Sequence, residues 1–306
     1  MNPTSRQSPD SVIRPDGKAA FDSIYDQPTP AAYFSVLQPL SYMTPGRAQP
    51  LVRRCVEALR RRRHLDTVTV LDLCSGYGIN GALLKCRLTM QELYERHATP
   101  YARDAGAGRI PADALWYRQR RRGDAGVRVI AQDVAERALH YSRTVGLADA
   151  VIAANLEERD ASATEAALMA KADLVVVTGG LSYIGERTFR RVLGVARRQP
   201  WALYFPLRHT DTEAIDVTFE GAGYTVETAR RTIAHRRFRS AEERRTLSAH
   251  IRAQRAPGDP GPSPTHLEAL IKLARPPNDL LMPPSDEITS ATAGGSETHA
   301  TSTAAG

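Results

Sequence analysis

Cysteine is scarce in this sequence, with three residues among 306, at positions 55, 74 and 86. These spacings form neither a disulfide framework nor a zinc-binding pattern, and they are typical of reduced thiols in a cytosolic protein. The sequence also lacks an H-E-x-x-H or comparable metal-binding motif and a G-x-S-x-G nucleophile motif. We therefore expect no metal centre and no serine-hydrolase chemistry.

Long apolar runs are missing as well. No stretch is long enough to span a bilayer, and the N-terminal segment MNPTSRQSPDSVIRPDG has no apolar core of a secretory signal. These features predict a cytoplasmic protein without a membrane partner. The 306 residues, of which 42% are hydrophobic and 25% charged, suffice for one large α/β domain with extensions.

Acidic residues are in the minority, with 34 Asp and Glu against 41 Lys and Arg, so the net charge is +7. The positive charge is concentrated in arginine-rich patches, of which the densest are Arg60–Arg63, Arg118–Arg122 and Arg236–Arg245. Such patches can bind nucleic acid or an acidic carrier. Because few aromatic residues alternate with these arginines, we favour a solvated surface over a nucleic-acid-binding one.

The most informative stretch is residues 67–85, TVTVLDLCSGYGINGALLK. Its apolar run over residues 68–73, rich in β-branched side chains, predicts a strand buried on both faces. The chain then turns through residues 74–78, and from Ile79 apolar residues recur at helical spacing. A strand, a turn of small residues and a helix predict a cradle for a polar ligand, because glycine lets a ligand approach the main chain closely.

The identity of that ligand depends on the residues around the turn. Gly76, Gly78 and Gly81 form the pattern G-x-G-x-x-G, which alone is compatible with dinucleotide binding. Asp72, at the end of the strand, argues against a dinucleotide. Its carboxylate would repel a pyrophosphate, whereas it would attract a ligand that carries an ammonium and a sulfonium group.

The run VLDLCSGYG resembles the first motif of the class I S-adenosylmethionine-dependent methyltransferases, an apolar pair and an acidic residue followed by G-x-G-x-G. Asp72 matches the acidic position, and Gly76 and Gly78 match the second and third glycines. Cys74 replaces the first glycine; because cysteine adopts a positive φ less readily, we expect an altered turn or a weaker affinity. The resemblance implies an α/β fold, doubly wound around a mostly parallel seven-stranded sheet, with a C-terminal antiparallel hairpin formed by residues 224–228 and 232–238.

A second acidic residue, Asp133, follows the next predicted strand, residues 127–131. It can accept both hydroxyls of an adenosine ribose, which is the role that the resemblance implies, or it can cap the helix predicted over residues 135–145. The third predicted strand, residues 150–154, is followed by residues that the resemblance places at the adenine. The full cofactor-binding set that the resemblance implies is Asp72, Cys74, Ser75, Gly76, Tyr77, Gly78, Asp133, Val134, Asn155, Leu156 and Thr178.

The acceptor side is less well defined. The buried strand predicted over residues 172–180 leads into Ser182 and Tyr183 at the carboxyl edge of the sheet, where cofactor and acceptor would meet, unless the glycines there only form a turn. His209, after the strand predicted over residues 201–207, is the histidine best placed to act as a base, although a lone loop histidine is often incidental. The candidates are Tyr25, Tyr33, Tyr42 and Ser182 for acceptor binding, and His209 and Tyr183 for catalysis.

The chain divides by composition into five parts. They are a disordered N-terminus (1–19), a helical lid segment (20–65), the S-adenosylmethionine-binding domain (66–240) with an insertion (98–126), C-terminal helices (241–275) and a disordered tail (276–306). The aromatic lid segment either closes over the ligand or simply anchors itself on the core, and Thr29 is expected to cap its first helix. The last C-terminal helix is predicted over residues 266–275.

These observations predict an S-adenosylmethionine-dependent methyltransferase that transfers a methyl group by in-line displacement to an unidentified small-molecule O or N acceptor. Two alternatives stay open at this point. One is an NAD(P)-dependent oxidoreductase, because of the glycine pattern. The other is a non-catalytic protein that binds S-adenosylmethionine or nucleic acid, because of Cys74 and the arginine patches.

Overall fold

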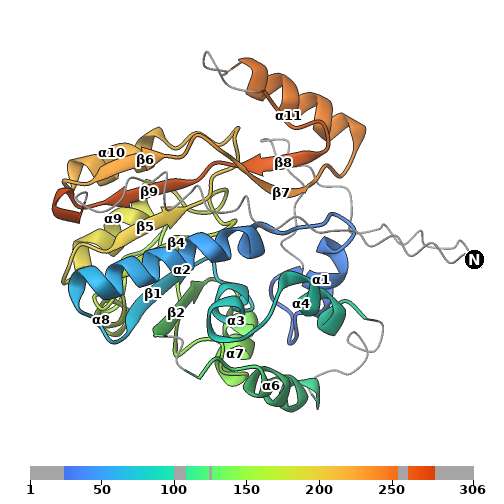
Figure 1. The fold of residues 1–306 in the computed structure, drawn as a ribbon, viewed down its shortest axis with the longest axis horizontal. Helices are drawn as coiled ribbons and strands as arrows, with labels where there is room; N and C mark the ends of the chain where they lie inside the picture. The colour runs from blue at the N-terminus through green and yellow to red at the C-terminus, as the bar shows by residue number, and fades with distance from the viewer. Residues whose placement is uncertain (1–23, 100–107, 124–125, 254–260, 280–306) are drawn as a thin grey trace, which may run out of the picture.

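The computed structural model describes residues 24–99, 108–123, 126–253 and 261–279, and at its centre lies a seven-stranded sheet (Figure 1). The predicted disordered N-terminus and nearly all of the predicted tail lie outside the described residues. The strands of the sheet, in spatial order, are β3 (Ala150–Ala153), β2 (Val127–Asp133), β1 (Val68–Leu73), β4 (Leu174–Val177), β5 (Trp201–Tyr204), β9 (Lys272–Arg275) and β6 (Thr225–Thr228).

Strands β1 to β5 pair in parallel, and β9 runs antiparallel to both of its neighbours, β5 and β6. The chain order reverses between β1 and β4, which creates the switch point where open α/β sheets bind their ligands. The predicted seven-stranded, mostly parallel sheet of the class I methyltransferase fold is thus confirmed.

Helices cover both faces of this sheet. The apolar side chains of β1 alternate, with Val68 and Val70 in one hydrophobic cluster and Leu71 and Leu73 in another. Because both clusters are buried, both faces need a helical layer. The helices around the sheet are α2 (Thr44–Arg63), α3 (Ile79–Lys85) and α7 (Glu136–Thr144) on one side, and α8 (Ala163–Met169), α9 (Glu186–Val195) and α10 (Glu213–Gly221) on the other.

Helix α1 (Ala31–Leu37) belongs to the segment over residues 24–44, called the N-terminal segment from here on, and two further helices pack near it: α4 (Met90–His97) and α6 (Arg109–Gln119). Helix α4 begins with a capping box between Thr89 and Glu92, as its sequence predicts. The predicted cap by Thr29 is wrong, because α1 begins one residue later than that cap requires, with Pro30 at the N-cap and no side-chain cap. The predicted insertion is partly helical, since it contains α6.

The C-terminal region differs most from the prediction. Strand β7 (Ile233–Arg237) does not pair with β6; it pairs antiparallel with β8 (His266–Ala269) in a separate two-stranded sheet. The predicted helix over residues 266–275 is also wrong, because this stretch forms β8 and β9. Strands of four residues are too short for apolar spacing to distinguish them from one turn of helix. Consequently the main sheet is completed by residues beyond the predicted domain boundary at 240.

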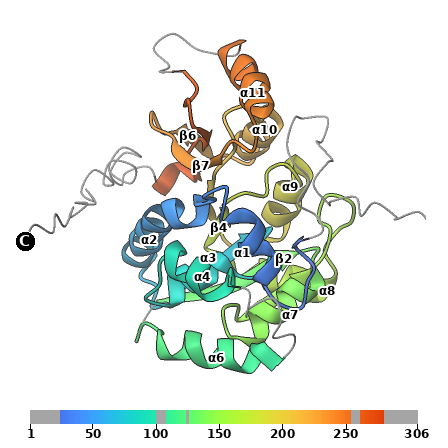
Figure 2. The same cartoon turned by 90° about the vertical axis from the view of Figure 1, so that its right-hand side faces the viewer.

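The segment from β7 to β8, with helix α11 (Ala241–Ala253) between them, is an excursion from the main sheet. Figures 1 and 2 both show α11 at the end of the molecule opposite α6. The base of this excursion contacts the N-terminal segment, because the carbonyl of His235 accepts from the N–H of Met43 at 2.9 Å. Among the helices of the described residues, none combines the length and apolar character that crossing a membrane requires.

Candidate active site

A cavity of about 400 Å³ lies at the carboxyl ends of the parallel strands, at the switch point of the sheet. The turn after β1, the ends of β2 and β3, the segment after β4 and the N-terminal segment all contribute to its lining. The residues of the implied cofactor set that line it are Cys74, Ser75, Gly76, Tyr77, Asp133, Val134, Asn155, Leu156 and Thr178. The structure therefore brings together side chains that are distant in the sequence.

The turn after β1 keeps a glycine-like backbone even at its cysteine. Cys74 has φ 54°, and Gly76 has φ 51°, so both lie in the left-handed region. A cysteine there is strained by about 1–2 kcal/mol. Its side chain has room because residue 180 is glycine: a Cβ on Gly180 would lie 2.4 Å from both Cβ and Sγ of Cys74. Gly180 thus makes room for the side chain of Cys74, and the turn keeps its left-handed backbone at this residue. The weaker affinity that cysteine was expected to cause as the alternative stays a prediction.

Gly78 and Gly81 serve packing rather than the cavity, whose lining includes neither of them. A Cβ on Gly78 would lie 2.8 Å from Cβ of Ser142, and one on Gly81 would lie 2.6 Å from the carbonyl oxygen of Leu147. Both glycines therefore allow α3 to approach the end of α7 and the turn that follows it. The implied cofactor contact of Gly78 has no counterpart in the cavity lining.

Asp72 lies behind the cavity wall and not in it, since it is fully buried and absent from the lining. Its carboxylate oxygens accept hydrogen bonds from Oγ of Ser75 at 2.8 Å and from Nδ2 of Asn80 at 2.7 Å. Burial raises the pKa of Asp72 to about 7, although these two hydrogen bonds oppose the rise. Any effect of Asp72 on a ligand would thus be transmitted through Ser75 and Asn80, which do line the cavity.

Asn80 is a residue that the sequence argument missed. Its Nδ2 also donates to Oγ1 of Thr178 at 2.9 Å, so it connects the end of β1 to the end of β4. The sequence feature that could have identified Asn80 is its polar side chain in the first turn of a helix whose other residues are mostly apolar.

Asp133 faces the cavity directly and is half-buried. Its two oxygens accept from the N–H of Gly76 at 2.8 Å and from the N–H of Ala135 at 3.0 Å. Burial raises the pKa of Asp133, while these N–H groups oppose the rise. A carboxylate has about four lone-pair positions, so two accepted bonds leave capacity for a ligand. The alternative role as the cap of α7 is wrong, because the N-cap of α7 is Ala135 and it has no side-chain cap. The carboxylate instead joins the turn after β1 to the end of β2 and faces the cavity.

The N-terminal segment closes one side of the cavity with aromatic rings. Tyr25, Tyr33 and Tyr42 all line it, and the ring of Tyr33 makes edge contacts with the other two at 5.5 and 6.4 Å. The hydroxyl of Tyr77, in the turn after β1, accepts from the N–H of Gln27 at 3.0 Å. This bond attaches the N-terminal segment to the turn across the cavity.

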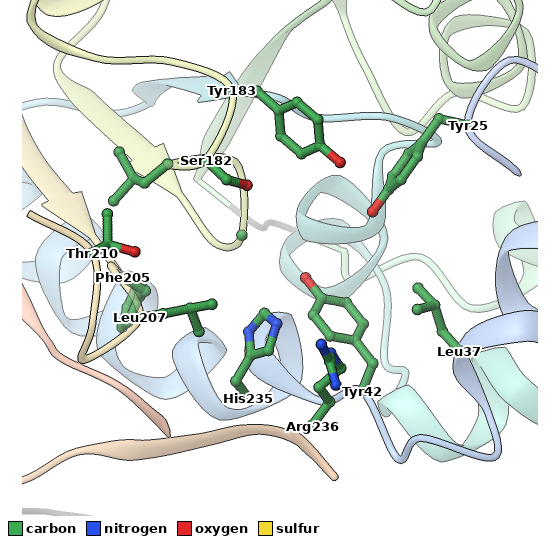
Figure 3. Close-up of a pocket in the computed structure, with 12 residues that line it drawn as sticks. Tyr25, Leu37, Tyr42, Ser182, Tyr183, Phe205, Leu207, Thr210, His235 and Arg236 are labelled. Carbon is green, nitrogen blue, oxygen red and sulfur yellow. The ribbon is translucent and has the colours of Figure 1, made fainter. Parts of the chain in front are cut away.

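A smaller pocket of about 60 Å³ adjoins the cavity (Figure 3). The two share four lining residues, Tyr25, Tyr42, Gly179 and Tyr183. The rest of its lining is partly apolar (Leu37, Leu181, Phe205, Leu207) and partly polar (Ser182, Thr210, His235, Arg236).

His209 lies outside the lining of both pockets, and its ring contacts that of His250 on α11 at 6.4 Å. The histidine that the structure places in the smaller pocket is His235, which the sequence argument did not single out. It lies on β7, a strand whose pairing was predicted wrongly. Within the described residues, no group of three His, Cys, Asp or Glu side chains could hold a metal ion.

Comparison with known proteins gives similarity at the level of fold. No protein-family model matches the sequence, and no curated protein is significantly similar to it. Among solved structures, precorrin-6y C5,15-methyltransferase from Geobacter metallireducens is 15% identical, with a TM-score of 0.32 over 74% of this chain and 87% of its own. Magnesium protoporphyrin IX methyltransferase from Synechocystis, solved with bound SAH, is 12% identical, with a TM-score of 0.37 over 74% and 83%. A TehB-like SAM-dependent methyltransferase from Corynebacterium glutamicum is 13% identical, with a TM-score of 0.35 over 72% and 87%.

Proposed function

We propose that this protein is an S-adenosylmethionine-dependent methyltransferase that acts on a small-molecule O or N acceptor. The observation that carries the proposal is the 400 Å³ cavity, which has the glycine turn and Asp133 in its wall and a second pocket beside it. A cofactor cavity next to a separate acceptor pocket is the arrangement that direct group transfer requires.

The lining of the larger cavity suits the parts of this cofactor. Asp133 would accept the ribose hydroxyls, with its orientation fixed by the N–H groups of Gly76 and Ala135. Val134 and Leu156 offer apolar surfaces for the adenine, and the segment at Asn155 lies at its edge. The amino-acid end would lie near Ser75 and Thr178, which Asn80 and Asp72 hold in place.

The bound cofactor would supply a methyl group on a sulfonium sulfur. Because the sulfur is a good leaving group, the transfer needs no covalent intermediate on the enzyme. The protein contributes alignment of the two molecules and exclusion of water. Tyr25, Tyr42 and Tyr183 lie where the two pockets meet, so they would contact both molecules, with Ser182 on the acceptor side. Tyr33 lines the larger cavity but not the smaller pocket, so it would act on the acceptor through its ring contacts with Tyr25 and Tyr42.

The same lining weakens the dinucleotide alternative. It contains two carboxylates, Asp26 and Asp133, and none of its described residues is Lys, Arg or His. A pyrophosphate would therefore meet negative charge without a cation to neutralise it. A ligand with a sulfonium and an ammonium group has the complementary charge.

Isothermal titration calorimetry with S-adenosylhomocysteine tests the proposal. We expect binding to the wild type and a 10- to 100-fold weaker affinity for Asp133→Ala, because the ribose loses its acceptor. Glu136→Ala is the matched control, since this exposed acid lies three residues away and outside the cavity lining. Binding of a nicotinamide dinucleotide in place of S-adenosylhomocysteine, or equal effects of the two variants, would overturn the proposal.

A further inference from the structure

We infer that the smaller pocket takes the hydroxyl-bearing end of an uncharged acceptor, and that His235 accepts the proton of this hydroxyl during methyl transfer. This inference depends on the proposed function and names the acceptor class that the site would serve. It assigns the role of base to His235 in place of His209.

The backbone of β7 directs His235 into the pocket. In the pairing of β7 with β8, Ala234 lies opposite Glu268 and Arg236 lies opposite Leu267, so His235 is the additional residue of a β-bulge. Bulges interrupt the regular alternation of a strand and redirect a side chain, and they are common beside active sites. Here the redirected side chain lines the pocket between the N-terminal segment and the end of β5 (Figure 3).

Contacts with the N-terminal segment fix the position of the imidazole. Nδ1 of His235 lies 2.7 Å from Oγ1 of Thr44, a side chain that is fully buried at the start of α2. The ring also makes an edge contact with Tyr42 at 5.1 Å. In the tautomer that this inference requires, Nδ1 carries the proton and donates to Oγ1 of Thr44, so Nε2 has the lone pair that would receive a hydroxyl in the pocket.

The charge of the lining selects against a cationic acceptor. The described residues that line the smaller pocket include no Asp or Glu, and the guanidinium of Arg236 is already paired with Glu243 through bonds of 3.0 and 2.6 Å. A cationic acceptor would have no carboxylate among these residues to pair with, and it would be repelled by the sulfonium group of the cofactor in the larger cavity. An anionic acceptor would meet in Arg236 a guanidinium whose charge Glu243 already balances. The pocket therefore suits an uncharged molecule.

The volume limits how much of the acceptor is buried. A cavity of about 150 Å³ holds one benzene molecule, and this pocket measures about 60 Å³. It can enclose a hydroxyl and a few neighbouring atoms, while the rest of the acceptor extends outside. Figure 3 shows the hydroxyl ends of Tyr25, Tyr42 and Tyr183 turned toward one another beside this space, so hydrogen-bonding groups surround the reacting end.

These features favour oxygen as the methylated atom. A neutral amine attacks through its lone pair before it loses a proton, whereas a hydroxyl needs a base as the new bond forms. In the inferred step, the acceptor O–H bond breaks and its proton moves to Nε2 of His235. The oxygen forms a bond to the methyl carbon, whose bond to sulfur breaks with the electron pair remaining on sulfur. Imidazole is the side chain best suited to hold that proton near neutral pH.

The test uses protein labelled with ¹⁵N-histidine, saturated with S-adenosylhomocysteine, and two probes of similar shape: benzyl alcohol and benzylammonium. The His235 ring signals are assigned by their loss in His235→Asn, with His209→Asn as the matched control. We expect benzyl alcohol to shift the Nε2 signal of His235 in the direction of an accepted hydrogen bond, and to bind at least 10-fold more tightly than benzylammonium. His235→Asn should weaken benzyl alcohol binding at least 5-fold, while His209→Asn should change it less than 2-fold.

The failure of this inference is distinguishable from failure of the proposed function. If S-adenosylhomocysteine does not bind, the proposed function fails. If it binds, but benzyl alcohol shifts the ring of His209 and not that of His235, or benzylammonium binds as well as the alcohol, the inference is overturned. The affinities of benzyl alcohol and benzylammonium are compared on the wild type alone, so this part of the test does not depend on whether the variants fold.

Discussion

The two neighbouring pockets share a wall but are built from different parts of the chain. The larger one is formed mainly by strand ends of the parallel sheet, and its polar groups include main-chain N–H groups and the carboxylate of Asp133. The smaller one is formed by side chains from the N-terminal segment, the segments after β4 and β5, and the excursion between β6 and β9.

The larger cavity is therefore a product of the main sheet, whereas the smaller pocket also depends on the excursion, which is an addition to that sheet. The sheet with its turn makes a ligand site that needs little beyond the topology itself. The excursion brings His235 and Arg236 to that site through a two-stranded sheet of its own. It follows that the two pockets should respond separately to mutation.

Glu243→Gln gives the strongest test of this separation. The carboxylate and the guanidinium of Arg236 each have 4% exposed side-chain area, so the variant leaves a buried charge without its partner. We expect a loss of about 3–5 kcal/mol in the free energy of unfolding of the excursion. Hydrogen exchange should show faster opening of β7 and α11, whereas calorimetry should show unchanged affinity for S-adenosylhomocysteine. The neighbouring and exposed Glu242 provides the control variant Glu242→Gln. If hydrogen exchange became faster in β1 and β4 to the same extent, the excursion and the main sheet would unfold as one cooperative unit.

Gly180→Ala should damage the wall of the larger cavity. Its Cβ would lie 2.4 Å from Cβ and Sγ of Cys74, and overpacking of this kind costs about 1–3 kcal/mol. The double variant Gly180→Ala/Cys74→Gly should recover most of this loss, because glycine removes the clashing atoms and relieves the positive φ. Urea unfolding measures both effects. Gly194→Ala, in a helix with nothing near the added Cβ, is the control and should not destabilise. Failure of the second change to rescue the first would show that the two residues do not compete for the same space.

Asp72→Asn should change how stability depends on pH. An aspartate in the unfolded chain releases its proton near pH 3.8, whereas Asp72 in the folded protein keeps its proton up to about pH 7. Between these values the folded state binds more protons, so its free energy of unfolding decreases as the pH rises. We expect similar stability of variant and wild type at pH 5, and a variant more stable by about 1–3 kcal/mol at pH 8. The exposed Asp66 gives the control Asp66→Asn. If the free energies of unfolding of variant and wild type differed by the same amount at both pH values, the raised pKa of Asp72 would be contradicted.

The larger pocket was predictable from sequence because its residues follow the strands in short, local patterns. The strand before Asp72, the turn at Gly76 and the acidic end of β2 each have a signature within a few residues. The smaller pocket has no such signature. The pairing of β7 with β8 joins residues separated by about 30 positions, and the bulge at His235 depends on that pairing. Local spacing instead favoured a hairpin of β6 with β7, which long-range pairing overrides.

The hydroxyl of Tyr77 links the turn beneath the larger cavity to the segment that covers it. It accepts from Gln27 and lies 3.1 Å from the carbonyl oxygen of Ile24, so the cover cannot lift while these bonds persist. An occupant whose departure displaced this segment would have to break these bonds as well as its own contacts, so the Tyr77 hydroxyl would lengthen its residence time.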